Sequence, residues 1–162
     1  MRQNMDDKYF MEAALDCARL ALSNDEIPVG AVIVQDNKII GSGYNSCISS
    51  NDPSAHAEIM AIRAACKTNG NYRLTTASIY VTLEPCLMCV GAIIHSRLKR
   101  LVFGTTDPKT GSVISKINVN NLGFTNHKPE VVSDILGKEC GDLLRDFFRN
   151  KRNKQKDKQE RN

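Results

Sequence analysis

The chain has no apolar run long enough to cross a membrane, and its first eight residues are polar with no apolar segment behind them. A membrane-spanning helix needs about 20 apolar residues, and a secretory signal needs an apolar stretch near its start, so neither is expected. The six cysteines are scattered and do not resemble the framework of a small secreted protein. Internal repeats and domain linkers are also absent. With 162 residues and 41% hydrophobic content, the sequence predicts one globular domain over residues 1–150.

One histidine and two cysteines have the residue types of a zinc site. They are His56, in His56-Ala57-Glu58, and Cys86 and Cys89, in Pro85-Cys86-Leu87-Met88-Cys89. Four protein ligands normally make a structural zinc site, whereas three ligands leave one tetrahedral position for water and make a catalytic one. A second Cys-x-x-Cys pair, which a four-cysteine zinc ribbon needs, is missing. The set therefore predicts one catalytic Zn²⁺, and its thiolates suit a reducing, cytoplasmic setting.

Glu58 is expected to move protons beside that metal. Asp52-Pro53 predicts the N-cap and first-turn proline of a helix that starts just before His56. Successive helical residues are about 100° apart, so His56 and Glu58 point in different directions and cannot easily reach one metal together. A second helix is predicted over residues 86–95, where the positive end of the helix dipole favours a thiolate. Glu58 is therefore better placed to serve a metal-bound water than to bind the metal.

Other interpretations of these residues stay open. A Cys-x-x-Cys pair in a cytosolic protein can be redox-active or form half of a structural zinc finger. Cys66 and His95 are the nearest candidate fourth ligands, nearly three helical turns beyond His56 and nearly two beyond Cys89. Glu84, close to the cysteines, is expected to make a structural hydrogen bond or ion pair rather than act in the chemistry.

Helical and strand patterns alternate along the chain. Helices are predicted over residues 6–23, around His56, and over residues 86–95 and 136–151. Strands are predicted over residues 29–34, 38–44, 78–83, 100–103 and 130–132, and residues 113–119 are expected to hold a short strand or a turn. Strands that alternate with helices imply an α/β fold, in which a central, largely parallel sheet is covered on both faces.

Positive charge is concentrated at the C-terminal end. Seven basic residues face only two acidic ones after residue 148, a net of +5, although the whole chain carries +4. The basic residues are Arg149, Lys151, Arg152, Lys154, Lys156, Lys158 and Arg161. Terminal blocks of one charge are most often solvated, so residues 151–162 are expected to form a frayed or disordered basic tail. The alternative is an arm that attracts the phosphates of a nucleic acid.

The zinc motifs, together with Pro28-Val29-Gly30-Ala31-Val32, resemble those of the zinc-dependent cytidine and deoxycytidylate deaminases. Further segments over residues 8–152 resemble the tRNA-specific adenosine deaminase branch of that superfamily. These segments are Asn45, Asp52-Pro53, Asn71-Tyr72-Arg73-Leu74, Thr82-Leu83-Glu84-Pro85-Cys86, His95-Ser96-Arg97, Phe103-Gly104, Asp107-x-Lys109-Thr110-Gly111, Asn126-His127 and Asp146-Phe147-Phe148-Arg149. The resemblance implies a three-layer α/β/α sandwich around a mixed, mostly parallel five-stranded sheet, and a homodimer.

The resemblance also implies an activity, the hydrolytic deamination of adenosine to inosine at the wobble position of a tRNA anticodon. Zinc-bound hydroxide would attack the base, with Glu58 as the proton shuttle. The resemblance places Asn45 on the flipped nucleotide, assigns Ile27, Val29 and Leu83 to its pocket, and lets Asp107 sense a ribose 2′-hydroxyl. It places Phe148 and Arg149 near the RNA, which favours a binding role for the basic tail.

One segment departs from the family pattern. Where the family has small residues leading into a Gly-Ser pair, this chain has Ser112-Val113-Ile114-Ser115, whose bulky side chains could reshape a loop near the anticodon arm. Two other functions stay open. One is a deaminase of a free base or nucleotide such as cytosine or guanine, which would leave the basic tail and Asp107 without a role. The other is a non-catalytic, zinc-stabilised RNA-binding subunit, which would have no use for Glu58.

Overall fold

Five strands form one mixed sheet in a computed structural model of the chain, which describes the backbone of residues 2–162 and the side chains from Asp7 onward. The strands are β1 (Gly30–Gln35), β2 (Lys38–Tyr44), β3 (Ser78–Leu83), β4 (Arg100–Thr105) and β5 (Glu130–Val132). Their order is β2-β1-β3-β4-β5. β1 is antiparallel to both neighbours, whereas β3, β4 and β5 are parallel. Four strands thus point the same way, which confirms the predicted mixed, mostly parallel five-stranded sheet.

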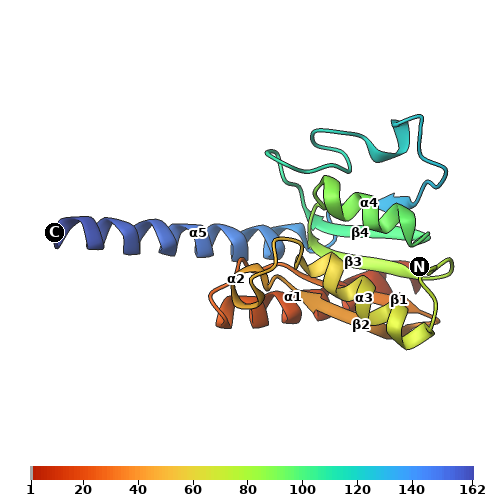
Figure 1. Ribbon diagram of the computed structural model, residues 1–162, viewed down its shortest axis with the longest axis horizontal. Coiled ribbons are helices and arrows are strands. Elements are labelled where there is room, and N and C mark those ends of the chain that lie inside the picture. The colour runs from red at the N-terminus through yellow and green to blue at the C-terminus, as the bar shows by residue number, and fades with distance from the viewer. Residues whose placement is uncertain (1) are drawn as a thin grey trace.

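Helices cover both faces of this sheet (Figure 1). They are α1 (Arg2–Ser23), α2 (Cys47–Ser50), α3 (Ala57–Asn69), α4 (Leu87–His95) and α5 (Gly137–Glu160), with a short 3₁₀ helix at Val119–Asn121. α3 and α4 share one core with the inner residues of β1, β3 and β4, and Leu144 of α5 joins it; α1 and Cys140 of α5 share a second core on the opposite face. The predicted three-layer α/β/α sandwich is therefore confirmed.

Alternation along the strands creates the two cores. In β1, Ala31 and Ile33 join the α3 and α4 side, while Val32 and Val34 join the α1 and α5 side. All four are buried. Neighbouring strand residues point to opposite faces of a sheet, so a strand covered on both sides must be apolar throughout. The hairpin between β1 and β2 turns at Asp36–Asn37, where φ is 51° and 60°, as a tight hairpin turn requires.

α3 lies directly on β2 because two glycines remove the side chains between them. A Cβ atom added to Gly43 would lie 2.6 Å from the carbonyl oxygen of Ala57, and one added to Gly41 would lie 2.6 Å from the carbonyl oxygen of Ala61. Real Cβ atoms essentially never come closer than 3.0 Å to such atoms. The N-terminal part of the α3 backbone is therefore held against β2.

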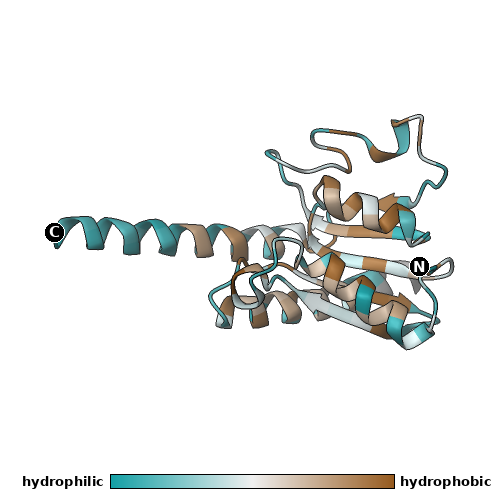
Figure 2. Ribbon diagram, in the orientation of Figure 1, coloured by the Kyte–Doolittle hydropathy of each residue, from teal (hydrophilic) through white to brown (hydrophobic). Residues whose placement is uncertain are grey.

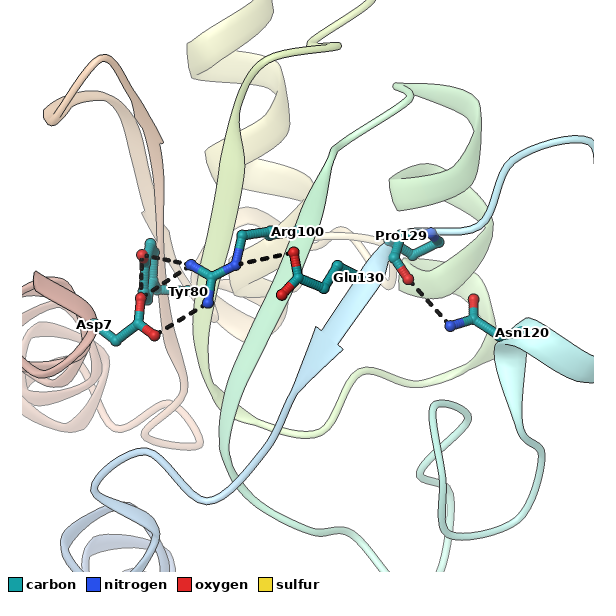
Figure 3. A network of polar contacts seen from close by, with 6 residues as sticks. All are labelled: Asp7, Tyr80, Arg100, Asn120, Pro129 and Glu130. Atoms are coloured by element: carbon teal, nitrogen blue, oxygen red, sulfur yellow. Dashed lines mark hydrogen bonds and ion pairs between the residues drawn. The ribbon is translucent and has the colours of Figure 1, made fainter. Parts of the chain in front are cut away.

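An ion-pair network lies at the end of the sheet where β3, β4 and β5 begin (Figure 3). The Arg100 guanidinium donates to both Asp7 oxygens at 3.0 and 3.1 Å, and the Tyr80 hydroxyl donates to Asp7 at 2.7 Å. Arg100 also pairs with Glu130 at 3.6 Å. Burial opposes ionisation of Asp7, but the hydrogen bonds from Arg100 and Tyr80 outweigh it and lower the pKa of that carboxyl. The network links α1, β3, β4 and β5.

Residues 113–119, expected to hold a short strand or a turn, form a turn that leads into the 3₁₀ helix. Two expected helix ends differ from the structure. The first helix starts at Arg2 rather than at residue 6. The last helix continues to Glu160 instead of ending near Lys151, and every residue from 148 onward is exposed (Figure 1). The expected fraying of residues 151–162 in solution stays a prediction. Within residues 2–162, each helix is too short or too polar to pass through a lipid bilayer.

Candidate metal centre and active site

The starts of two helices bring the predicted metal ligands together. His56 is the N-cap of α3 and Cys86 the N-cap of α4, both with extended backbone, and Cys89 lies in the first turn of α4. β3 ends at Leu83, so α4 begins just beyond the carboxyl end of that strand. In parallel-stranded α/β sheets this edge is where binding sites form.

The helix starts beside His56 as predicted, but the predicted Asp52-Pro53 cap is wrong. Asp52 does not cap it: its carboxylate accepts hydrogen bonds from the N–H and hydroxyl of Ser54, which builds a local turn instead. The α3 cap is completed by Asn45, whose side-chain oxygen accepts the N–H of Ala57 at 2.8 Å. Polar side chains that bond their own neighbours in this way compete with helix formation.

The three candidate ligands have the spacing of a zinc site. Nδ1 of His56 lies 3.6 Å from Sγ of Cys86 and 3.6 Å from Sγ of Cys89. Zinc–nitrogen and zinc–sulfur bonds of usual length, arranged tetrahedrally, separate such atoms by about 3.6 Å. Among the side chains of residues 7–162, no fourth His, Cys, Asp or Glu joins this group, so Cys66 and His95 stand apart from it. The group fits one zinc ion with a position left for another ligand.

The pKa values of the two thiols are shifted in opposite directions. A hydrogen bond from Cys89, helped by His56, lowers the pKa of the Cys86 thiol to about 4 against the effect of burial. The hydrogen bond to Cys86 and burial raise the pKa of the Cys89 thiol. Zinc binds thiolates, so Cys86 is already in the form that a metal requires, and metal binding at Cys89 would release a proton.

Glu58 lies beside the metal group without belonging to it. Its side chain is 4% exposed, and its Oε2 atom lies 3.4 Å from Sγ of Cys89. Burial raises the pKa of this carboxyl to about 7. A carboxyl with that pKa can hold or release a proton at neutral pH, which is what general acid–base catalysis needs.

Glu84 holds the loop that follows β4. The residue is 2% exposed, and its carboxylate accepts the N–H groups of Asp107, Val113, Ile114 and Ser115. The Ser115 hydroxyl donates to it as well. Although burial opposes ionisation, these bonds lower the pKa of Glu84. The structural role expected for Glu84 is therefore confirmed. Because Glu84 holds the loop through backbone N–H groups, the bulky side chains of Val113 and Ile114 do not prevent this contact.

Gly111, which the sequence names only as the last residue of the Asp107 segment, has a packing role that the sequence did not predict. A Cβ atom added there would lie 2.4 Å from Cδ of Glu84 and 2.4 Å from the carbonyl oxygen of Asp107. Only a glycine lets the loop close over the carboxylate. The sequence could not predict this fit, because Glu84 and Gly111 lie in different loops that meet only in the folded chain.

The residues expected to bind substrate lie at several places. Asn45 borders the metal helix, and its N–H donates to the carbonyl oxygen of Val29 at 3.1 Å, which brings residues 27–29 alongside. Ile27 is 37% exposed, Leu83 is half-buried and Val29 is buried in the core. Asp107 organises its own loop by accepting the N–H groups of Lys109 and Thr110.

Phe148 and Arg149 lie on α5, apart from the metal group. Phe148 is 41% exposed and packs edge-to-face on Phe147, and Arg149 pairs with Asp146 at 3.5 Å. The contacts that the structure gives these two side chains are within α5. They are free to meet a partner that approaches the exposed part of the helix.

Comparison with known proteins supports this picture. Residues 4–105 match the family model of the cytidine and deoxycytidylate deaminase zinc-binding region. The chain is 48% identical over 157 residues to a tRNA-specific adenosine deaminase of Haemophilus influenzae, covering 96% of this chain and 90% of the relative.

Two solved structures are also similar. One, from a study of A-to-I editing by tRNA:A34 deaminases at the wobble position of transfer RNA, is 44% identical, with a TM-score of 0.82 over 84% of this chain and 99% of that one. A guanine deaminase from Bacillus subtilis is 43% identical, with a TM-score of 0.58 over 60% of this chain and 63% of that one. The chain belongs to the cytidine and deoxycytidylate deaminase family, defined by its zinc-binding region, and within it to the branch of the tRNA-specific adenosine deaminases.

Proposed function

We propose that this protein deaminates adenosine to inosine in tRNA, at the wobble position of the anticodon. The main support is the buried Glu58 carboxylate, which lies 3.4 Å from Sγ of Cys89 and beside a group of three zinc ligands. The chain is also 48% identical to a tRNA-specific adenosine deaminase. A non-catalytic RNA-binding subunit would gain nothing from a buried acid at this place, because burying an ionisable group is costly.

His56, Cys86 and Cys89 are proposed as the zinc ligands. A zinc ion held there would lower the pKa of a coordinated water towards 7. The α3 and α4 N-termini hold the ligands at fixed spacing, and Asn45 holds the first turn of α3 through the N–H of Ala57. The chain thus supplies a rigid cradle before any substrate binds.

Glu58 is proposed to move the protons of the reaction. Water adds its oxygen to C6 of adenine, and Glu58 carries a proton from that water to the ring nitrogen N1. The C6–N6 bond then breaks, and Glu58 delivers a second proton to the departing amine, so that inosine and ammonia are the products. Proton transfer by a positioned carboxyl contributes roughly 10²–10⁴-fold to rate.

The other site residues are proposed to bind the substrate. Asn45 would hydrogen-bond the flipped nucleotide, Ile27, Val29 and Leu83 would line its pocket, and Asp107 would sense the ribose 2′-hydroxyl. Phe148 and Arg149 would lie against the RNA. An anticodon loop presents unpaired bases that can be splayed out without melting a duplex, which suits a site as buried as Glu58.

Three further assignments accompany this function. We place the reaction in the cytoplasm, since all six cysteines are free thiols. We propose a homodimer, supported by the exposed Leu87 and Phe124 beside α4, which a second copy would cover. Residues 1–150 are proposed as one deaminase domain.

The test is turnover of purified protein on an anticodon stem-loop RNA, its DNA counterpart, and free adenosine, cytidine and guanine. Inosine formed only from the RNA supports the proposal. Rapid consumption of a free base with the RNA untouched would establish the free-base deaminase instead. Glu58→Ala should abolish turnover while keeping zinc, and unchanged turnover in that variant would remove Glu58 from the mechanism.

A further inference from the structure

Glu26 is a buried carboxylate that the zinc chemistry does not use. It is 2% exposed, as is Glu84. Glu84 accepts hydrogen bonds from four N–H groups and one hydroxyl, whereas Glu26 accepts one within residues 7–162, from the N–H of Ser49 at 2.8 Å. A buried carboxylate is costly unless hydrogen bonds replace the water that it has lost. Stability alone therefore gives little reason for an acid at this position.

The hydrogen bond from Ser49 attaches α2 to the rest of the protein. α2 is a single helical turn with no buried residue. In the part of the chain from Asp7 onward, its other hydrogen bonds stay within residues 46–55. Its N-cap residue Ser46 makes no side-chain cap bond, so Glu26 accepts an N–H of the first turn that a cap would otherwise accept. Since packing does not bury α2, this contact fixes its position.

Glu26 is itself held in place by its backbone. Its N–H donates to the carbonyl oxygen of Ala21 in the last turn of α1 at 3.0 Å. The next residue, Ile27, accepts the N–H of Val29 at its own carbonyl oxygen, at 2.8 Å. Ile27 and Val29 are residues that we propose to line the nucleotide pocket. The Glu26 carboxylate therefore sets the distance between α2 and this pocket segment.

α2 lies at the edge of the sheet that carries the metal group. The N–H of Ser46, which precedes α2, donates to the carbonyl oxygen of Ala55 at 3.0 Å, and Ala55 precedes the candidate ligand His56. Figure 1 shows α2 at the end of the sheet from which α5 projects. Ile48, the second residue of α2, is 65% exposed. α2 thus presents an apolar side chain close to the metal group.

The apolar side chain of Ile48 suits contact with a nucleobase. Residues 149–162 of the neighbouring α5 contain no hydrophobic side chain, and the outer half of this helix is hydrophilic in Figure 2. That part of α5 therefore offers no apolar surface to a base. When one base of an RNA loop is drawn into an active site, the bases beside it are unstacked and expose their apolar faces. An isoleucine held beside the site can cover such a face.

We propose that Glu26 is a positioning residue for substrate binding, which holds α2 through Ser49 so that Ile48 packs against the base next to the reactive adenosine. This inference rests on the proposed function and adds a contact that the metal group and Glu58 do not supply. Because α2 is already in place before the RNA arrives, less ordering is needed on binding. The acid is thus retained for recognition, at a position where an apolar residue would be cheaper to bury.

The test compares two replacements of Glu26. E26M keeps a similar volume but cannot accept the N–H of Ser49, whereas E26Q keeps an acceptor oxygen. E26M should raise KM for an anticodon stem-loop RNA about 10-fold, because covering one isoleucine side chain is worth about that factor in affinity. Its kcat should stay at the value of the unaltered chain, since the lost contact does not involve the reacting atoms. E26Q should restore the original KM.

Stability distinguishes positioning from a purely structural role. E26M should unfold at the same denaturant concentration as the unaltered chain or at a higher one, because an apolar side chain replaces a buried carboxylate and the exposed Ser49 can turn its N–H to water. D7N is the matched control: it changes a carboxylate buried where β3, β4 and β5 begin, so it should lower stability and leave KM unchanged. If E26M loses stability and kcat with no change in KM, Glu26 is only structural and the proposal is wrong.

A double variant tests whether Glu26 acts through Ile48. I48A should raise KM by the same factor as E26M, and E26M/I48A should raise it no further, because both changes remove one contact. An additive rise of about 100-fold would overturn the proposal. On an RNA that lacks the bases on both sides of the reactive adenosine, E26M and the unaltered chain should have equal KM. If the unaltered chain forms no inosine, the proposed function fails; if it does and E26M matches its KM on intact RNA, only the role of Glu26 fails.

Discussion

The carboxylate of Glu84 accepts the backbone N–H of Ser115 at 3.0 Å and the hydroxyl of the same serine. The two residues lie 31 positions apart, and the contact ties the strand end that leads to Cys86 to the loop that carries Asp107. One side chain thus fixes the spacing between the metal group and a loop expected at the RNA.

Glu84→Gln should loosen this loop while leaving the metal in place. The amide keeps the shape of the carboxylate, but its NH₂ group cannot accept the N–H groups that converge on it. Hydrogen bonds to a charged group contribute about 1.5–3 kcal/mol each, so the free energy of unfolding should fall by roughly 2–3 kcal/mol. KM for RNA should rise more than kcat falls. Denaturant unfolding and steady-state kinetics check both, and a variant as stable as the original chain would refute the role of Glu84.

Gly111→Ala should displace the same loop by a different route. Its new methyl group would meet Glu84 and the Asp107 carbonyl at 2.4 Å, and forced overpacking costs about 1–3 kcal/mol. Gly91→Ala is the matched control, because a Cβ atom at Gly91 meets nothing within 4 Å and alanine favours the helix that contains it. The melting temperature should therefore fall in Gly111→Ala and stay equal or rise in Gly91→Ala, as thermal unfolding would measure. Equal melting temperatures would contradict the tight fit at Gly111.

Cys86→Ser should remove zinc and activity together. A hydroxyl is a poor replacement for the thiolate that Cys86 supplies at neutral pH. Metal analysis of the purified variant should give far less than one zinc per chain, and a chelator should bring the unaltered protein to the same state. Cys66→Ser, which lies outside the metal group, should keep its zinc. Retention of a full zinc equivalent by the Cys86 variant would show that the ligand set is wrong.

Asp7→Asn should change how stability depends on pH. The pKa of Asp7 is lowered in the folded chain, so its ionised form stabilises the fold above the unfolded pKa of about 3.9. That stabilisation is lost as pH falls through the lower, folded pKa. At pH 7 the variant, which leaves Arg100 paired only with the more exposed Glu130, should be less stable by about 3 kcal/mol. The difference should shrink below pH 4, as denaturant unfolding across pH 2–7 would measure; a difference independent of pH would argue against a charged Asp7.

Local patterns sufficed where neighbours in sequence decide the structure. Residues 78–83 and 130–132 are strands as predicted, because a β-branched or apolar run bounded by polar residues has few alternatives. The His56, Cys86 and Cys89 group also came from spacing and residue type alone. The capping of α3 did not, since the Asp52 carboxylate accepts the N–H of Ser54 and the distant Asn45 accepts the N–H of Ala57 instead. The contact of Glu84 with Ser115 and the fit of Gly111 likewise depend on chain segments that meet only after folding.

Because α3 packs closely on β2 at Gly43, the geometry of the metal group depends on how α3 is placed on the sheet. His56 moves with α3, while both thiols move with α4, so any separation of α3 from the strand shifts one ligand relative to the other two. Release of zinc should therefore be among the first signs that this half of the sandwich is opening, ahead of any loss of helical signal.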